Sequence, residues 1–198
     1  MRVWKEQFGR PRGVLGWLAG KLMGRGKGAF ARELLGAVGV EPDDRVLEIG
    51  FGPGIGIEVA ASLAPRGRVA GVDLSEVMLR MATRRNREAM REGRVELALA
   101  SVSALPFSDD AFDVAFAINS VQFWPALATD LKEVRRVLRP GGRLAIGVQL
   151  PSWILPATEA EAMGREVERR VREAGFRDVA RVQREARRTS TMRVTATK

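Results

Sequence analysis

Residues 46–54 read Val-Leu-Glu-Ile-Gly-Phe-Gly-Pro-Gly, an apolar run followed by glycines at every second position. The apolar run is typical of a buried parallel strand, and the closely spaced glycines predict a turn too tight for side chains. Ile55, Val59 and Leu63 then recur at helical spacing, so we expect a helix just after the turn. Such an arrangement lets a ligand approach main-chain N–H groups directly, although the glycines alone also fit a plain tight turn.

A second apolar run, residues 68–72, ends in a carboxylate at Asp73. An acidic residue about 20 positions beyond a glycine loop can accept hydrogen bonds from both vicinal hydroxyls of a ribose. The expected ligand is therefore a nucleoside. The dinucleotide fingerprint G-x-G-x-x-G fits badly, because after Gly50 and Gly52 it requires glycine where Ile55 stands.

This glycine loop, with the strand that follows it, resembles the S-adenosylmethionine (SAM) site of class I methyltransferases. The glycines have the spacing G-x-G-x-G after Glu48, and residues 71–75 follow as Gly-Val-Asp-Leu-Ser. Further segments fall in family order from about residue 44 to the C-terminus, among them residues 131–142. The resemblance implies SAM as the cofactor, and it implies cofactor contacts from Glu48, Gly50, Phe51, Gly52, Gly54, Asp73, Leu74, Ser101, Val102 and Asn119.

One segment departs from the family pattern. In the methyltransferases that this chain resembles, residues 101–107 border the adenine, and an acidic residue often stands where Ser101 does. With serine there, the exocyclic amine of adenine would depend on the Ser101 hydroxyl, backbone carbonyls or water.

Composition indicates one globular domain. The 198 residues are 45% hydrophobic and 29% charged, and they suffice to bury a core. The chain has neither cysteine nor histidine, so it lacks a disulfide framework, the commonest metal ligand and the commonest general base. No metal site is expected. No apolar run reaches transmembrane length and no signal peptide is evident, so we expect a cytoplasmic protein without stable membrane insertion, of undetermined oligomeric state.

The net charge of +9 is concentrated at the two ends of the chain. Residues 1–32 carry eight Lys and Arg against one Glu, and residues 165–198 carry eleven against five Asp and Glu. The middle, residues 33–164, has fourteen basic and eighteen acidic residues. Basic ends can attract nucleic acid, an anionic membrane or an acidic substrate, whereas a solvated arginine-rich surface accounts equally for the excess.

Residues 1–40 are expected to form a helical cover over the mouth of the site, ahead of a SAM-binding domain at residues 41–198. Val14, Leu15, Leu18 and Leu22 match a helical stripe, which several glycines interrupt. Trp17 is a candidate substrate contact within this cover. Basic residues flank the stripe, so an interfacial membrane helix is the alternative.

The pattern over residues 41–198 predicts an α/β fold. We expect a single doubly wound sheet of seven strands, mostly parallel, with an antiparallel C-terminal strand and helices on both faces. Strands after the first are expected at residues 68–73, 95–99, 114–118, 144–148, 176–182 and 192–197. Helices are expected at residues 29–38, from 55 onward, and at 75–92, 127–138 and 158–174, with a turn at residues 139–142.

Three polar or aromatic residues follow the expected fourth strand: Asn119, Gln122 and Trp124. Ligands of open α/β sheets bind beyond the carboxyl ends of the strands, so we expect these residues to face the reaction zone. Gln122 and Trp124 are candidate substrate contacts. For Trp124, packing between a helix and the sheet is an equally good interpretation.

The chemistry that follows is methyl transfer from SAM to a small organic acceptor. The sulfonium is already activated, so the enzyme must mainly align donor and acceptor and exclude water, and no catalytic residue is assigned. One alternative is an RNA or DNA methyltransferase that uses the basic ends, although the Asn-Pro-Pro-aromatic motif of nucleic-acid amino methylation is missing after Asn119. Another is a non-catalytic SAM-binding module.

Overall fold

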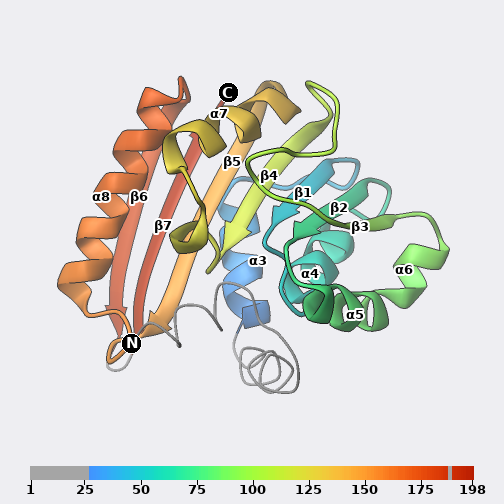
Figure 1. Ribbon diagram of the computed structural model, residues 1–198, viewed down its shortest axis with the longest axis horizontal. Coiled ribbons are helices and arrows are strands. Elements are labelled where there is room, and N and C mark those ends of the chain that lie inside the picture. The colour runs from blue at the N-terminus through green and yellow to red at the C-terminus, as the bar shows by residue number, and fades with distance from the viewer. Residues whose placement is uncertain (1–26, 187–188) are drawn as a thin grey trace.

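A single mixed sheet forms the centre of the computed structural model, which describes residues 27–186 and 189–198. Within these residues seven strands pair in the order β3-β2-β1-β4-β5-β7-β6 (Figure 1). The strands are β1 Arg45–Ile49, β2 Arg68–Asp73, β3 Val95–Leu99, β4 Phe112–Ile118, β5 Leu138–Pro151, β6 Arg177–Ala186 and β7 Thr189–Thr197. Of the cover expected at residues 1–40, the part before residue 27, with Trp17, lies outside the described residues.

Helices cover both faces of this sheet. Side chains of α3, α4 and α5 share one buried cluster with the sheet, and those of α7 and α8 share the other. In Figure 1, α8 runs across β6 and β7. The helical segments are α3 Lys27–Ala37, α4 Ile55–Leu63, α5 Glu76–Arg85, α6 Arg87–Arg91, the 3-10 turn η1 Val121–Phe123, α7 Leu127–Val137 and α8 Ala157–Glu173. None of those between residues 27 and 186 is long and apolar enough to cross a membrane.

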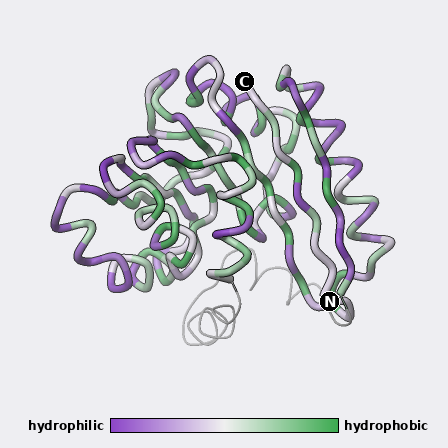
Figure 2. Tube along the Cα trace, turned by 180° about the vertical axis from the view of Figure 1, so that it is seen from behind, coloured by the Kyte–Doolittle hydropathy of each residue, from purple (hydrophilic) through white to green (hydrophobic). Residues whose placement is uncertain are grey.

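The predicted fold class is confirmed. The first five strands pair in parallel, whereas β7 runs antiparallel to both β5 and β6. Parallel strands are buried on both faces, and this is why β1 and β4 are nearly continuous apolar runs. Figure 2 shows hydrophobic residues along the central strands and hydrophilic ones on outer helix turns and loops.

The single helix expected over residues 75–92 is wrong, because α5 ends and α6 begins at Asn86. The Asn86 side chain is buried and donates to two carbonyl oxygens, those of Ala82 and Gly54, at 3.0 Å each. A side-chain amide that bonds the preceding turn competes with helix continuation. The bond to Gly54 also joins this break to the glycine loop.

The fifth strand is much longer than the expected residues 144–148. Its pairing with β4 begins at Leu138, which lies opposite Phe112, and the register shifts before Val114 pairs with Arg143. The expected turn at residues 139–142 therefore lies inside the strand bounds, with Gly141 at a positive φ of 75°. At its other end β5 continues to Pro151, opposite Thr189, so β5, β6 and β7 all extend beyond the predicted lengths.

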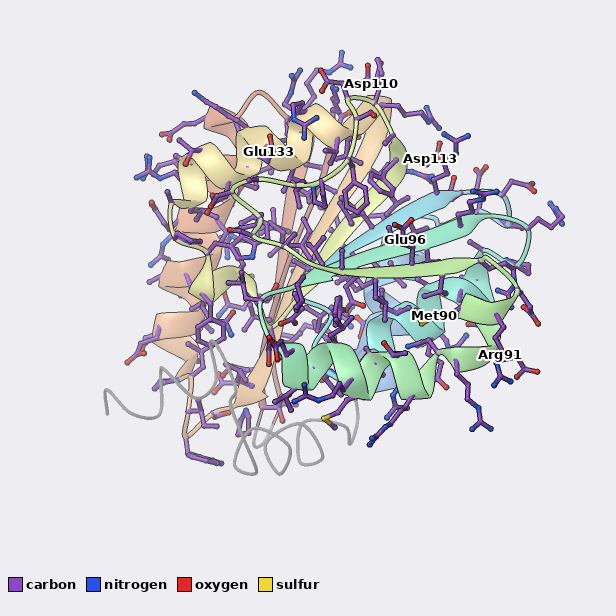
Figure 3. The ribbon with its side chains drawn as sticks, turned by 45° about the vertical axis from the view of Figure 1, so that its right-hand side comes forward. Met90, Arg91, Glu96, Asp110, Asp113 and Glu133 are labelled. Carbon is purple, nitrogen blue, oxygen red and sulfur yellow. The ribbon has the colours of Figure 1, made fainter. Side chains whose placement is uncertain are left out.

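Helix α7 fixes the segment that joins β3 to β4. The Arg136 guanidinium donates to the carbonyl oxygens of Leu105 and Phe107, and Glu133 accepts from the Leu105 N–H at 2.9 Å. Arg136 also pairs with Glu133 at 2.8 Å, and Figure 3 labels Glu133 on α7 beside this segment. The buried Asp130 carboxylate accepts from the Ser103 hydroxyl at 2.7 Å. These bonds fix the connection between β3 and β4, which contains no helix, against α7.

The Glu133–Arg136 pair predicts how stability depends on pH. The hydrogen bond from Arg136 lowers the pKa of Glu133, an effect that burial opposes. Because the folded-state pKa is below the unfolded one, the stabilisation is complete above about pH 4.5 and is lost as the pH falls through the folded value. Glu133→Gln should cost about 1 kcal/mol at pH 7 and progressively less in acid.

Chemical denaturation of both proteins at several pH values measures this difference. Glu96→Gln, at an exposed glutamate on the edge strand β3 that Figure 3 also labels, is the control and should leave stability unchanged at every pH. A Glu133→Gln deficit that persists undiminished at the acid end would contradict the assignment of the stabilisation to the charged pair.

Candidate active site

A pocket opens at the carboxyl ends of β1, β2 and β4, where the strands meet the loops that follow them. Its walls are the glycine loop, the end of β2, the segment after β3 and the segment after β4. It is lined by Ala31, Glu48, Ile49, Gly50, Phe51, Gly52, Pro53, Ile55, Gly56, Val72, Asp73, Leu74, Met78, Ala100, Ser101, Val102, Ile118, Asn119, Ser120, Phe123, Trp124 and Pro125.

The backbone of the glycine loop forms one wall of this pocket and determines its shape. Gly50, Gly52 and Gly54 all have positive φ values, which L side chains rarely adopt. A Cβ on Gly50 would collide with Ser120, and a Cβ on Gly54 would collide with Ala82 and Asn86. A Cβ on Gly52 would meet no protein atom within 4 Å, so it would project into free space.

The loop does not offer free main-chain donors as the sequence suggested. The N–H groups of Gly50 and Phe51 both donate to the Val72 carbonyl, and the Gly54 N–H donates to the Phe51 carbonyl. The Gly52 N–H donates to Asp73 at 2.9 Å, and Pro53 has no N–H. Direct contacts from these N–H groups to a ligand, which the sequence suggested, would have to be shared with the bonds inside the protein. Other backbone groups and the Asp73 carboxylate satisfy these donors, and the bare surface of the loop backbone faces the pocket.

Asp73 ties the loop to the end of β2. One carboxylate oxygen accepts from the Gly52 N–H, and the other accepts from the Ser75 N–H, also at 2.9 Å. Each oxygen keeps acceptor capacity, because a carboxylate oxygen offers two lone pairs. Burial raises the pKa of Asp73 above its usual value, and the bonds from Gly52, Ser75 and Leu74 oppose this shift.

Glu48 is the other acidic residue in the pocket wall. Its side chain is 2% exposed, and its carboxylate lies against Gly56 in the first turn of α4, where any Cβ would collide with it. The N-terminus of a helix favours negative charge, so α4 stabilises an ionised carboxylate at this place. Among the described lining residues, Glu48 and Asp73 are the ionisable ones. No cluster in the described part of the chain could hold a metal ion.

The segment after β4 forms the opposite end of the pocket. Asn119 has a positive φ of 52°, and its side-chain oxygen accepts from the Gln149 N–H on β5 at 2.7 Å. The Ser120 hydroxyl donates to the Ile49 carbonyl at 2.7 Å and so joins this segment to β1. Phe123, Trp124 and Pro125 follow and make the pocket wall apolar here.

Most of the residues predicted from sequence meet in this pocket. Lining it are Glu48, Gly50, Phe51, Gly52, Asp73, Leu74, Ser101, Val102, Asn119 and Trp124. Gly54 is not among the lining residues because it packs against α5. Gln122 is not among them either, and its amide nitrogen donates to the Asn119 carbonyl at 3.0 Å.

Sequence reasoning missed several lining residues, chiefly Gly56, Ser120 and Phe123. One signal was present for Gly56, because it continues the alternation of glycines one step beyond residue 54. For Ser120 no sequence signal existed. Its importance comes from the close approach to Gly50, a residue of a different strand end.

The sequence of this chain matches that of a known protein family. Residues 47–146, which contain the glycine loop, Asp73 and the segment after β4, match the family model described as "Methyltransferase domain". The chain belongs to this family. It is accordingly a class I SAM-dependent methyltransferase, with SAM as its cofactor.

Individual relatives differ in how much of their length they share with this methyltransferase. An uncharacterized methyltransferase of Bacillus subtilis, YdaC, is 26% identical over 82% of this chain and 87% of its own. The 27-O-demethylrifamycin SV methyltransferase of Amycolatopsis mediterranei is 37% identical over 72% of this chain, but the match spans only half (50%) of that enzyme. Among solved structures, a SAM-dependent methyltransferase from Aquifex aeolicus shares the fold with a TM-score of 0.71 at 22% identity, covering 84% of this chain and 88% of that one.

Gly52 provides a direct test of the pocket. Gly52→Val should lose some stability, because its φ of 51° strains any residue with a Cβ, and should abolish SAM binding, because the side chain would fill ligand space. Gly93→Val is a matched control. Gly93 also has a positive φ, 70°, and also meets nothing within 4 Å, but it lies in the turn between α6 and β3.

Isothermal calorimetry with SAM and thermal melts separate the two effects. Both variants should melt at lower temperature than the parent, and only Gly52→Val should lose SAM binding. If Gly52→Val binds SAM as the parent does, the loop is a structural turn and not a ligand surface.

Proposed function

We propose that this methyltransferase transfers the methyl group of SAM to a small organic acceptor with an apolar body. The observation that carries the proposal is the composition of the pocket along its length. One end holds an oriented carboxylate, Asp73, beside a bare glycine loop, and the other end is apolar at Phe123, Trp124 and Pro125. The first suits a nucleoside cofactor, and the second suits an apolar acceptor.

Asp73 would bind the ribose of SAM. Its two oxygens are held by the N–H groups of Gly52 and Ser75, and their remaining lone pairs can accept both ribose hydroxyls. Leu74, the next residue, also lines the pocket. It is 44% exposed, so an apolar surface beside Asp73 is accessible to a ligand. Leu74 and Val102 would cover the faces of the adenine, with the Ser101 hydroxyl near its edge.

Glu48 would act at the methionine end of SAM. The cofactor carries positive charge on its ammonium and sulfonium groups, and a buried carboxylate favours such charge at short range. Gly50 and Gly52 would let the cofactor approach the loop backbone. Phe51 lies beneath the loop and is 3% exposed, so its contribution is to hold the loop in place.

Alignment of donor and acceptor is the main catalytic task in this proposal. Glu48 and Asp73 would both be occupied by the cofactor, so the described pocket wall leaves no carboxylate to serve as a general base. The acceptor must therefore be nucleophilic by itself or lose its proton to solvent. Residues 152–156 alone link β5 to α8, and so short a link leaves no room for an inserted substrate domain.

Labelled SAM tests this function. Purified protein incubated with methyl-labelled SAM and a metabolite extract should transfer label to a small molecule. Label recovered in RNA or DNA instead would favour the nucleic-acid alternative, and no transfer to any fraction would favour a SAM-binding module. The cytoplasmic location stays a prediction.

Asp73→Asn should weaken SAM binding by roughly ten- to a hundredfold, since it removes a charged acceptor of two hydrogen bonds. The pKa of Asp73 is raised by burial, so affinity for SAM in the parent should fall as the pH drops through a range above that of an ordinary aspartate. Asp73→Asn should show no such dependence. Calorimetric titration from pH 7.5 to pH 5 measures both, and unchanged affinity in a folded variant would remove Asp73 from the site.

Residues 1–40 are proposed to complete the site as a cover. Within this range α3 is described, and Ala31 of α3 lines the pocket. Deleting residues 1–26 should leave a folded protein that binds SAM more weakly and no longer transfers methyl groups to the acceptor found above. If the segment were a membrane anchor instead, the truncated protein would keep full activity and lose only liposome binding.

A further inference from the structure

Asn119 is held in a conformation that most residues avoid. Its φ of 52° lies in the left-handed region, which asparagine tolerates better than most residues with a Cβ but still at a cost. Three hydrogen bonds fix it there. Its N–H donates to the Gly147 carbonyl at 2.8 Å, its carbonyl accepts from the Gln122 amide, and its side-chain oxygen accepts from the Gln149 N–H.

These bonds also determine which way the Asn119 amide is turned. The Gln149 N–H can only donate, so the atom that faces it at 2.7 Å must be the side-chain oxygen. The nitrogen, Nδ2, is therefore the free end of the amide. It makes no hydrogen bond to any described residue and is not among their fully buried polar atoms, so it is open to a ligand.

The hydrogen-bond donors of the neighbouring polar side chains at this end of the pocket are already engaged, and the buried side-chain oxygen of Gln122, which has no partner among the described residues, can only accept. The Ser120 hydroxyl donates to the Ile49 carbonyl, and the Gln122 amide nitrogen donates to the Asn119 carbonyl. Phe123 and Trp124 supply apolar surface. Asn119 Nδ2 is thus a single oriented donor in an otherwise apolar part of the pocket wall, and such isolated polar groups set ligand orientation.

We propose that Asn119, which the family resemblance suggested as a cofactor contact, is instead a positioning residue whose amide N–H donates a hydrogen bond to an oxygen atom of the acceptor. The enzyme would accordingly select apolar acceptors that carry a hydroxyl or enol oxygen at the end that enters the pocket. This inference rests on the proposed function and assigns the substrate class of the same site.

The Asn119 N–H donor also helps such an acceptor to react although the described pocket wall offers no free base. A hydrogen bond to the oxyanion form favours that form, so the hydroxyl releases its proton to solvent more readily. An electron pair of the oxygen, or of the carbon conjugated to it, then forms the new bond to the methyl group. The electrons of the old carbon–sulfur bond stay on sulfur, and SAM leaves as S-adenosylhomocysteine.

Two substitutions isolate this role. Asn119→Asp keeps the size, the tolerance of a left-handed backbone and an oxygen for the Gln149 N–H, but it removes the N–H donor. Asn119→Gly keeps the backbone conformation and deletes the amide altogether. Thr129→Asp is the charge-matched control, since it adds one carboxylate at an exposed position of α7 outside the pocket.

The probes are 2-naphthol and 2-methylnaphthalene, which differ by a hydroxyl in place of a methyl group. Ligand-observed NMR titration of the full chain loaded with S-adenosylhomocysteine measures their relative affinities. The parent and Thr129→Asp should prefer the naphthol by roughly three- to tenfold, the value of one neutral hydrogen bond. Asn119→Asp and Asn119→Gly should lose that preference while binding SAM within about twofold of the parent.

A second measurement uses the natural acceptor once labelled SAM has revealed it. The pH at which kcat/KM reaches half its maximum should move upward in Asn119→Gly, which a purely structural role would not produce. No preference for the naphthol in the parent, or equal preference in all variants, would overturn this inference and leave the proposed function intact. A large loss of SAM affinity in Asn119→Asp would make Asn119 a cofactor contact and would also overturn it. Failure of the parent to bind SAM would overturn both.

Discussion

The hydrogen bond between Asp73 and the Gly52 N–H is the contact on which the site depends. It crosses from the end of β2 to the loop after β1, so it sets the distance between two elements that line the same pocket. Burial of this carboxylate raises its pKa, which means that the folded protein bears a cost for keeping it ionised at neutral pH. A bound ribose would offset that cost by supplying further donors. The ionised Asp73 therefore lowers the free energy of unfolding of the protein when no cofactor is bound.

Hydrogen bonds from helices on both faces of the sheet hold the pocket loops in place. On one face Asn86 bonds the Gly54 carbonyl and fixes the glycine loop against α5. On the other face Arg136 and Glu133 of α7 hold the segment after β3, which carries Ser101 and Val102. Loops that lack regular structure need such outside partners, because only some of their backbone groups pair with each other. The pocket at the strand ends is consequently held in shape by contacts from both helical layers.

Methyl transfer needs positioning more than it needs reactive side chains, and the residue content of the chain agrees with this. With no histidine or cysteine in the sequence, and two carboxylates in the described pocket wall, the polar groups available at the acceptor end are amides and hydroxyls. Their directions are determined by bonds between strand ends, as with Asn119 and Gln149. Small differences in those bonds would change which acceptor is aligned, whereas the cofactor end would stay the same.

The sequence by itself determined the fold class, the succession of strands and helices along the chain and many of the residues that line the pocket, because these follow from local patterns. Apolar runs mark buried parallel strands, glycines mark a backbone that excludes side chains, and Asp73 stands where its strand ends. The tertiary structure alone decided the break at Asn86, the length of β5, the satisfied N–H groups of the glycine loop and the orientation of the Asn119 amide. Each of these depends on a partner from another element of the fold, and a pattern within one segment of sequence carries no information about which group will lie opposite it.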